Sequence, residues 1–209
     1  MHNVNSTTNQ RSVLASLRAL VPQRHILPWE AMRLAELQAN RLLRHFQIEG
    51  ATVPEQIVSE FPRVRVIREA GLPVSGAAHW NGRYWIITVN ADEPLARQRF
   101  SLMHEFKHVL DHTTKDFLYH DRPVQTAGEQ AERVADYFAA CLLMPKRVVK
   151  RLWCQGNQNI ALLAEQLGVS TQALRYRLDQ LGLTEQAHRC DRRSIKPAVI
   201  TPVLVGRSL

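Results

Sequence analysis

Two histidines and a glutamate fall within five residues of the sequence, His104-Glu105-Phe106-Lys107-His108. Four residues advance an α-helix by about 400°, so His104 and His108 stand nearly above one another and can bind one metal ion. Glu105 is rotated away from the first histidine, where it does not bind the ion but can accept a proton from a water bound to it. The spacing therefore indicates a hydrolytic metal site. The alternative is a polar helix face on which these residues occur by chance.

A catalytic zinc ion needs a third protein ligand and one open position. Glu129 and Glu132 lie on the next predicted helix, and either could reach the ion. Asp136 follows Glu132 by four residues on the same helix face, where it could accept the free N–H of a ligating histidine. Glu129 has Arg133 at the matching position, so the pair Glu132/Asp136 is favoured. Two imidazoles and a carboxylate favour zinc, with manganese and iron as alternatives.

Helices and strands must bring these residues together. Apolar residues recur at helical spacing over residues 29–47, and helices are also predicted over 95–112 and 129–144, with a weaker one over 54–61. Strict alternation over 63–69 predicts a half-exposed strand. Residues 76–90 predict a hairpin with a type I′ turn at Asn81-Gly82. This order of helix, sheet, helix and helix predicts an α+β domain ending near Pro145.

The composition is that of a globular chain, with 209 residues, 45% hydrophobic and 22% charged. No apolar run approaches the length needed to cross a bilayer, and the first residues lack the pattern of a secretory signal. The three cysteines are widely spaced and form no CxxC pair, which indicates reduced thiols. These features predict a cytoplasmic protein without a membrane partner.

The net charge of +8 is concentrated in the last third of the chain. Residues 1–145 hold 16 Lys+Arg against 15 Asp+Glu, whereas residues 146–209 hold 11 against 4. A basic segment of this kind suggests DNA or an acidic partner.

Residues 159–183 predict two short helices joined by a turn at Gly168, with Ser170 as the N-cap of the second. The second helix is predicted to turn Arg175 and Arg177 outward. This is a helix-turn-helix arrangement, and we predict DNA or partner contacts from its exposed residues, namely Ser170, Thr171, Gln172, Arg175 and Tyr176. Alternatively, the helical hairpin packs on the rest of the protein.

The stretches RQRFSLMHEFKHVLDH (97–112) and ERVADYFAACLLMP (132–145) closely resemble the ImmA/IrrE family of metallo-endopeptidases. The resemblance implies that His104, His108 and Glu132 bind one zinc ion per chain and that Glu105 is the general base. It also implies a zincin-like fold, in which a small twisted sheet is combined with an active-site helix and a glutamate helix, followed by a small helix-turn-helix-like module. Lys107 stands where the family usually has a small residue, and we expect it to place a cation beside the site.

The predicted organisation has four parts: a flexible arm over 1–25, a zincin-like metallopeptidase domain over 26–145, a helix-turn-helix-like module over 146–185, and a basic and apolar tail over 186–209. The resemblance implies hydrolysis of a regulatory protein, typically a helix-turn-helix repressor whose cleavage switches on phage, mobile-element or stress genes. The alternative is a non-catalytic, metal-stabilised regulator that binds DNA or a repressor, which the basic C-terminal third favours.

Overall fold

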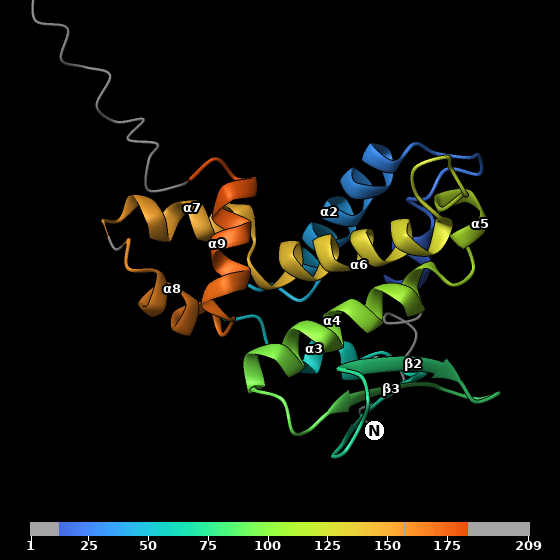
Figure 1. The fold of residues 1–209 in the computed structure, drawn as a ribbon, viewed down its shortest axis with the longest axis horizontal. Coiled ribbons are helices and arrows are strands. Elements are labelled where there is room, and N and C mark those ends of the chain that lie inside the picture. The colour runs from blue at the N-terminus through green and yellow to red at the C-terminus, as the bar shows by residue number, and fades with distance from the viewer. Residues whose placement is uncertain (1–12, 157, 184–209) are drawn as a thin grey trace, which may run out of the picture.

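The computed structural model describes residues 13–156 and 158–183, and Figure 1 shows helices stacked against a small sheet. The strands are β1 (Val64–Glu69), β2 (Gly76–Trp80) and β3 (Trp85–Asn90). The named helices are α2 (Pro28–His45), α3 (Gln56–Ser59), α4 (Leu95–Asp111), α5 (Lys115–Leu118), α6 (Ala127–Leu143), α7 (Lys146–Cys154), α8 (Ile160–Leu167) and α9 (Thr171–Gln180). The predicted α+β class is confirmed.

The sheet has the strand order β1-β3-β2, so β2 is an edge strand. Strand β3 pairs in parallel with β1 and antiparallel with β2. Helix α4 packs against β2 and β3, and α6 packs on α4 and on α2 (Figure 1). Helix α4, which carries the histidine pair, therefore lies between the sheet and the helix that carries the candidate carboxylates.

The predicted hairpin is present, but its turn is not the predicted type I′ turn at Asn81-Gly82. A type I′ turn requires a positive φ at both central residues. Gly82 has a φ of 93°, but neither of its neighbours, Asn81 and Arg83, has a positive φ. The backbone N–H of Asn81 donates to the carbonyl of Tyr84, which centres the turn on Gly82 and Arg83. The side-chain oxygen of Asn81 accepts the backbone N–H groups of Arg83 and Tyr84 and so holds Asn81 at the start of the turn.

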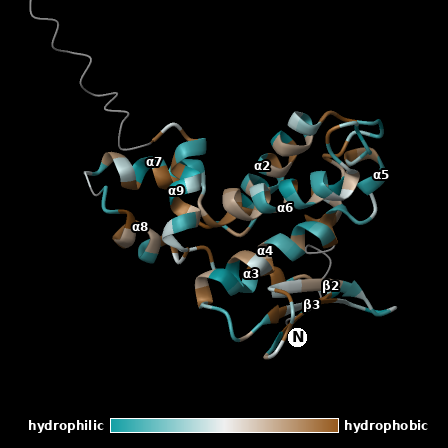
Figure 2. Ribbon diagram, in the orientation of Figure 1, coloured by the Kyte–Doolittle hydropathy of each residue, from teal (hydrophilic) through white to brown (hydrophobic). Residues whose placement is uncertain are grey.

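The core lies where α2, α4 and α6 meet. Leu102 and Phe106 of α4 are buried against the same cluster as Val134 and Phe138 of α6. These helices carry both hydrophobic and hydrophilic residues around their circumference (Figure 2), because one side faces this core and another faces solvent.

The N-terminal segment belongs to the core from residue 13 onward. Residues 13–18 are helical, and Val13, Leu17 and Val21 are buried. The predicted flexible arm over 1–25 is therefore wrong for its described part, because the apolar side chains of this segment complete the core. Residues 1–12 and the predicted tail over 186–209 lie outside the described residues.

The C-terminal helices include α7, which the sequence did not indicate, as well as the predicted α8 and α9. Gly168 takes the left-handed conformation between α8 and α9, and the Ser170 side chain accepts the backbone N–H of Ala173, as expected of an N-cap. The outward orientation predicted for Arg177 is wrong, because its side chain is buried. Its Nε donates to the carbonyl of Met144 at the end of α6.

Among the described residues, no helix combines the length and the apolar character that crossing a membrane requires.

Candidate metal centre

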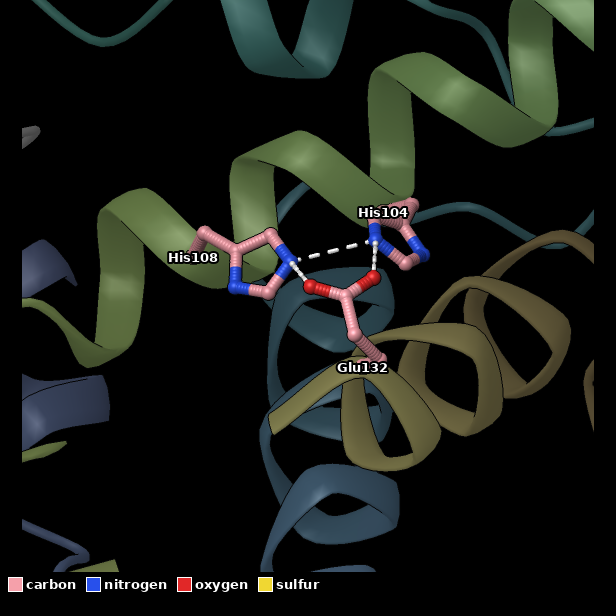
Figure 3. Close-up of side chains that lie close together, drawn as sticks. All are labelled: His104, His108 and Glu132. Carbon is pink, nitrogen blue, oxygen red and sulfur yellow. Dashed lines mark hydrogen bonds and ion pairs between the residues drawn. The ribbon is translucent and has the colours of Figure 1, made fainter. Parts of the chain in front are cut away.

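Three side chains from two helices converge at the face that α4 turns toward α6. His104 and His108 project from α4, and the carboxylate of Glu132 reaches from α6 to both rings (Figure 3). The Nε2 atoms of the two histidines are 3.1 Å apart. The Glu132 carboxylate oxygens lie 3.1 Å from His104 Nε2 and 3.3 Å from His108 Nε2. In the described part of the chain, this is the one group of three potential metal-ligand side chains brought this close together.

The start of α6 determines which glutamate reaches the histidines. Thr126 and Glu129 form a capping box, in which each side chain accepts the backbone N–H of the other. This commits Glu129 to closing the first turn of the helix. Glu132 lies one turn further along, free of the cap, and it is the one of the two candidates that joins His104 and His108.

The donor atoms fit a metal ion. Ligands bound tetrahedrally at zinc distances are roughly 3.3 Å from one another, close to the separations within this trio. His104 Nδ1 is 2.8 Å from a carboxylate oxygen of Asp136, so its proton is best placed on Nδ1. His104 Nε2 then presents a lone pair toward the Glu132 carboxylate and toward His108. A cation between these atoms, or a proton carried on one of the two Nε2 atoms, would compensate the facing lone pairs.

The burial and the mutual charges of these side chains shift their pKa values. Burial lowers the pKa of His104, but the hydrogen bond and charge of Asp136, with the charges of Glu105 and Glu132, raise that pKa above its ordinary value overall. The pKa of His108 is lowered, first by burial and then by the charge of His104. Burial raises the pKa of Glu105. A partly buried carboxyl group of this kind is a stronger base than a carboxylate in water.

A cleft of about 340 Å³ lies beside the trio. It is lined by Ser75 and Gly76 from the start of β2, by Arg97, Phe100, Ser101, His104 and Glu105 from α4, and by Glu132 and Asp136 from α6. A Cβ atom at Gly76 would lie 3.1 Å from Cγ of Glu105. The missing side chain therefore lets the edge strand approach Glu105 closely.

A second cavity of about 400 Å³ lies at the other end of the histidine pair. It is lined by His108, Asp111, His112, Lys115, Asp116, Tyr119, Ala127, Gly128 and Ala131. His112 caps the end of α4 and packs against Trp85, with ring centroids 4.8 Å apart. Along α4, the first hollow is thus lined by residues between 97 and 105, and the second by residues between 108 and 112.

Lys107 does not place a cation in the cleft, contrary to the sequence-based expectation. It precedes His108 by one residue and is therefore rotated by about 100° from it around the helix, into the protein. The side chain is 1% exposed, and its Nζ donates to Gln38 Oε1 at 2.8 Å and to Asp111 Oδ1 at 2.5 Å. The hydroxyl of Tyr119 donates to the other oxygen of Asp111. Lys107 is thus part of a buried network between α4, α2 and the end of α5.

The predicted partner-contact residues of the C-terminal module lie on the outer face of α9 and its N-cap. Ser170, Thr171, Gln172, Arg175 and Tyr176 are all exposed. The inner face packs on the helices that carry the trio. The Arg177 guanidinium lies over the ring of Tyr137 in α6, and a Cβ at Gly168 would lie 3.3 Å from the guanidinium of Arg99 in α4. The module therefore packs on the protein while keeping this outer face exposed.

Sequence reasoning missed the residues that shape the cleft, above all Gly76 and Arg97. Arg97 could have been found, because it precedes His104 by seven residues and so lies on nearly the same helix face. Gly76 carries no local signal, since its role depends on the approach of β2 to α4.

Comparison with known proteins gives a family and a fold. The peptidase M78 family, described as the IrrE N-terminal-like domain, matches residues 63–179. No curated protein matches the chain. Among solved structures, a Mycobacterium tuberculosis transcriptional regulator matches with a TM-score of 0.52 and 17% sequence identity, over 78% of this chain and 50% of that one. The chain thus spans about half the length of that regulator, and at this identity the likeness concerns the fold alone. The peptidase M78 match fits the predicted zincin-like fold.

Proposed function

Because the chain belongs to the peptidase M78 family of IrrE N-terminal-like domains, we propose that it is a zinc-dependent endopeptidase that cleaves a regulatory protein. The observation that carries this proposal is the convergence of His104, His108 and Glu132 beside the cleft that Glu105 lines. We assign the three as zinc ligands. Zinc, when bound, would supply a Lewis acid that polarises a peptide carbonyl and makes a water molecule more acidic.

The protein's own residues would position the substrate and move the proton. Glu105 lies outside the ligand trio and in the cleft, so it can take the proton of the attacking water and later pass it to the leaving amine. Its raised pKa strengthens it as a base, and it acts only when deprotonated. The Asp136 carboxylate fixes the His104 tautomer whose Nε2 is free to bind a metal.

The substrate backbone would add to the exposed edge of β2 as a further strand. We propose a helix-turn-helix repressor as the protein cleaved, in the cytoplasm. Residues 26–145 would carry the catalytic residues, and the module over 146–185 would help to reach the partner.

The direct test incubates the zinc-loaded protein with helix-turn-helix repressors from the same organism and measures the products by intact-mass spectrometry. Glu105→Gln should keep zinc and lower cleavage by about 10²- to 10⁴-fold, the usual contribution of a general base. His104→Ala should lose both zinc and cleavage. A folded, zinc-loaded Glu105→Gln protein with full activity would contradict the mechanism.

The second candidate function is that of a metal-stabilised regulator that binds DNA without cutting a protein. The observation that favours it is the exposed outer face of α9, including Arg175 and Tyr176, in a basic part of the chain. Binding of duplex DNA that weakens steeply with salt and persists in Glu105→Gln would support this function. No affinity for a duplex at low salt would rule it out.

A further inference from the structure

Among the described residues that line the cleft beside the zinc ligands, Arg97 is the one arginine and there is no lysine. Its side chain is 56% exposed, and it lies in the first turns of α4. The carboxylates of the same cleft belong to Glu105, Glu132 and Asp136, which are grouped around the histidines. The cleft therefore has an acidic end at the zinc ligands and a basic end at Arg97.

The Arg97 guanidinium, which lines the cleft, is held by Ser75, the residue just before β2. Its Nε and Nη2 lie 3.3 and 3.2 Å from Ser75 Oγ, which itself donates to Glu93 at 2.6 Å. Within the described part of the chain, Arg97 forms an ion pair with Glu93, with 3.8 Å between Nε and a carboxylate oxygen. These contacts use only part of the five N–H donors of a guanidinium. Arg97 is thus oriented and still able to bind a carboxylate.

The direction of β2 relative to α4 places Arg97 along a bound peptide. Gly76, at the start of β2, lies against Glu105. Trp80, at its end, is opposite Trp85, which packs on His112 at the end of α4. Strand β2 therefore runs from the Arg97 end of the cleft toward the His112 end. A peptide added antiparallel to β2 runs the other way, so its carboxyl-terminal part lies at Arg97.

The separation of Arg97 and His104 along α4 indicates which substrate residue would lie at Arg97. Seven residues separate Arg97 from His104, which is about 10.5 Å along the helix axis. An extended chain advances about 3.3 Å per residue, so this distance corresponds to about three substrate residues.

We propose that Arg97 is a specificity-determining residue that binds an acidic side chain of the substrate, at the second to fourth residue on the carboxyl side of the cleaved bond. This inference rests on the proposed peptidase function and adds a substrate class to it: peptides with aspartate or glutamate at that place. The carboxylate would form a charge-assisted hydrogen bond with the guanidinium.

The test is digestion of a proteome-derived peptide library by the zinc-loaded full-length protein, with the new termini read by mass spectrometry. Aspartate and glutamate should be enriched up to about fivefold at the second to fourth residue after the cut, as expected for one partly exposed ion pair. Arg97→Gln should abolish this enrichment, and Arg97→Glu should replace it with a preference for lysine and arginine. Arg83→Glu is the matched control, because Arg83 is exposed in the hairpin turn and lines neither cavity. It should cleave as the wild type does.

A binding measurement separates this inference from the proposed function. The Glu105→Gln protein, with and without Arg97→Glu, is immobilised and exposed to the same library. Capture of acidic peptides that depends on Arg97, without cleavage by the wild type, would support the subsite and contradict the peptidase. Cleavage without an acidic preference, or with one that persists in Arg97→Glu, would overturn the subsite and leave the peptidase intact.

Discussion

Glu105 and Lys107 flank the histidine pair on opposite sides of α4, and the protein treats these two charged residues in opposite ways. Glu105 follows His104 by one residue and faces β2 and the cleft. Lys107 precedes His108 by one residue and points toward α2, where Gln38 accepts one of its hydrogen bonds, while Asp111 at the end of α4 accepts another. The pattern of charged residues around the histidine pair therefore does not tell which of them line the cleft. The difference is that one side of the histidine pair is open to the cleft, whereas the other is covered by another helix.

On the side of α4 that carries Lys107, the buried polar groups are hydrogen-bonded to one another. The Lys107 ammonium has two hydrogen-bond acceptors and lies 5.8 Å from the ring centre of Phe138. Gln38, in turn, donates to the carbonyl of Leu17. Burial lowers the pKa of Lys107, and the neighbouring Asp111 opposes that effect. A buried hydrogen-bonded network of this kind helps to hold α4 in one position relative to its neighbours.

The largest expected effect is on the Lys107 side and concerns stability. Asp111→Asn removes the negative partner and leaves a buried ammonium, which should lower the free energy of unfolding by about 3–5 kcal/mol. Lys107→Met in the same protein removes the stranded charge and should restore much of this loss. Urea unfolding of the wild type, the two single variants and the double variant measures the coupling. Additive losses would show that the two residues do not form a buried pair.

The second expected effect is the stabilisation by zinc, which should depend on the histidines and not on Lys107. Zinc at 100 times its dissociation constant should stabilise the wild type by about 2.7 kcal/mol relative to the chelated protein. Lys107→Met should melt at a lower temperature but show the same zinc-induced increase. His108→Ala should show no increase. Thermal unfolding with zinc and with a chelator gives all three values, and a zinc response lost in folded Lys107→Met would contradict this independence of Lys107.

The smallest effect concerns Asp136, which acts through His104. Asp136→Asn should weaken zinc binding by about 10- to 100-fold, because the carboxylate no longer fixes the histidine tautomer. Competition with a chromogenic chelator measures this change. Asp116→Asn is a suitable control, since it removes an exposed carboxylate from the second cavity, away from His104. Equal affinities for zinc in all three proteins would show that Asp136 does not orient the ligand.

Much of the fold around the site follows from local sequence patterns. Helical spacing predicted α2, α4 and α6 because each of these long helices has one continuous apolar side. The i, i+4 spacing placed His104 above His108, and a second such pair singled out Glu132 with Asp136. Each of these relations lies within one helix, where geometry depends on spacing alone.

The errors concern contacts between elements. Lys107 was expected beside the site because the sequence does not show that α2 covers that side of α4. Arg177 was expected outside because Leu174, Leu178 and Leu181 were assigned to the inner face of this helix. It is buried because it satisfies the Met144 carbonyl at the end of α6, where no further turn of that helix provides a donor. Both cases require knowledge of which helix lies opposite.

The most direct test of the metal centre is X-ray diffraction from zinc-soaked crystals, with data collected on both sides of the zinc absorption edge. We expect one strong anomalous peak within about 2.0–2.2 Å of Nε2 of His104, Nε2 of His108 and a carboxylate oxygen of Glu132. Glu105 should lie outside this distance. The absence of a peak among these three side chains in a zinc-binding protein, or a peak at another place, would contradict the account.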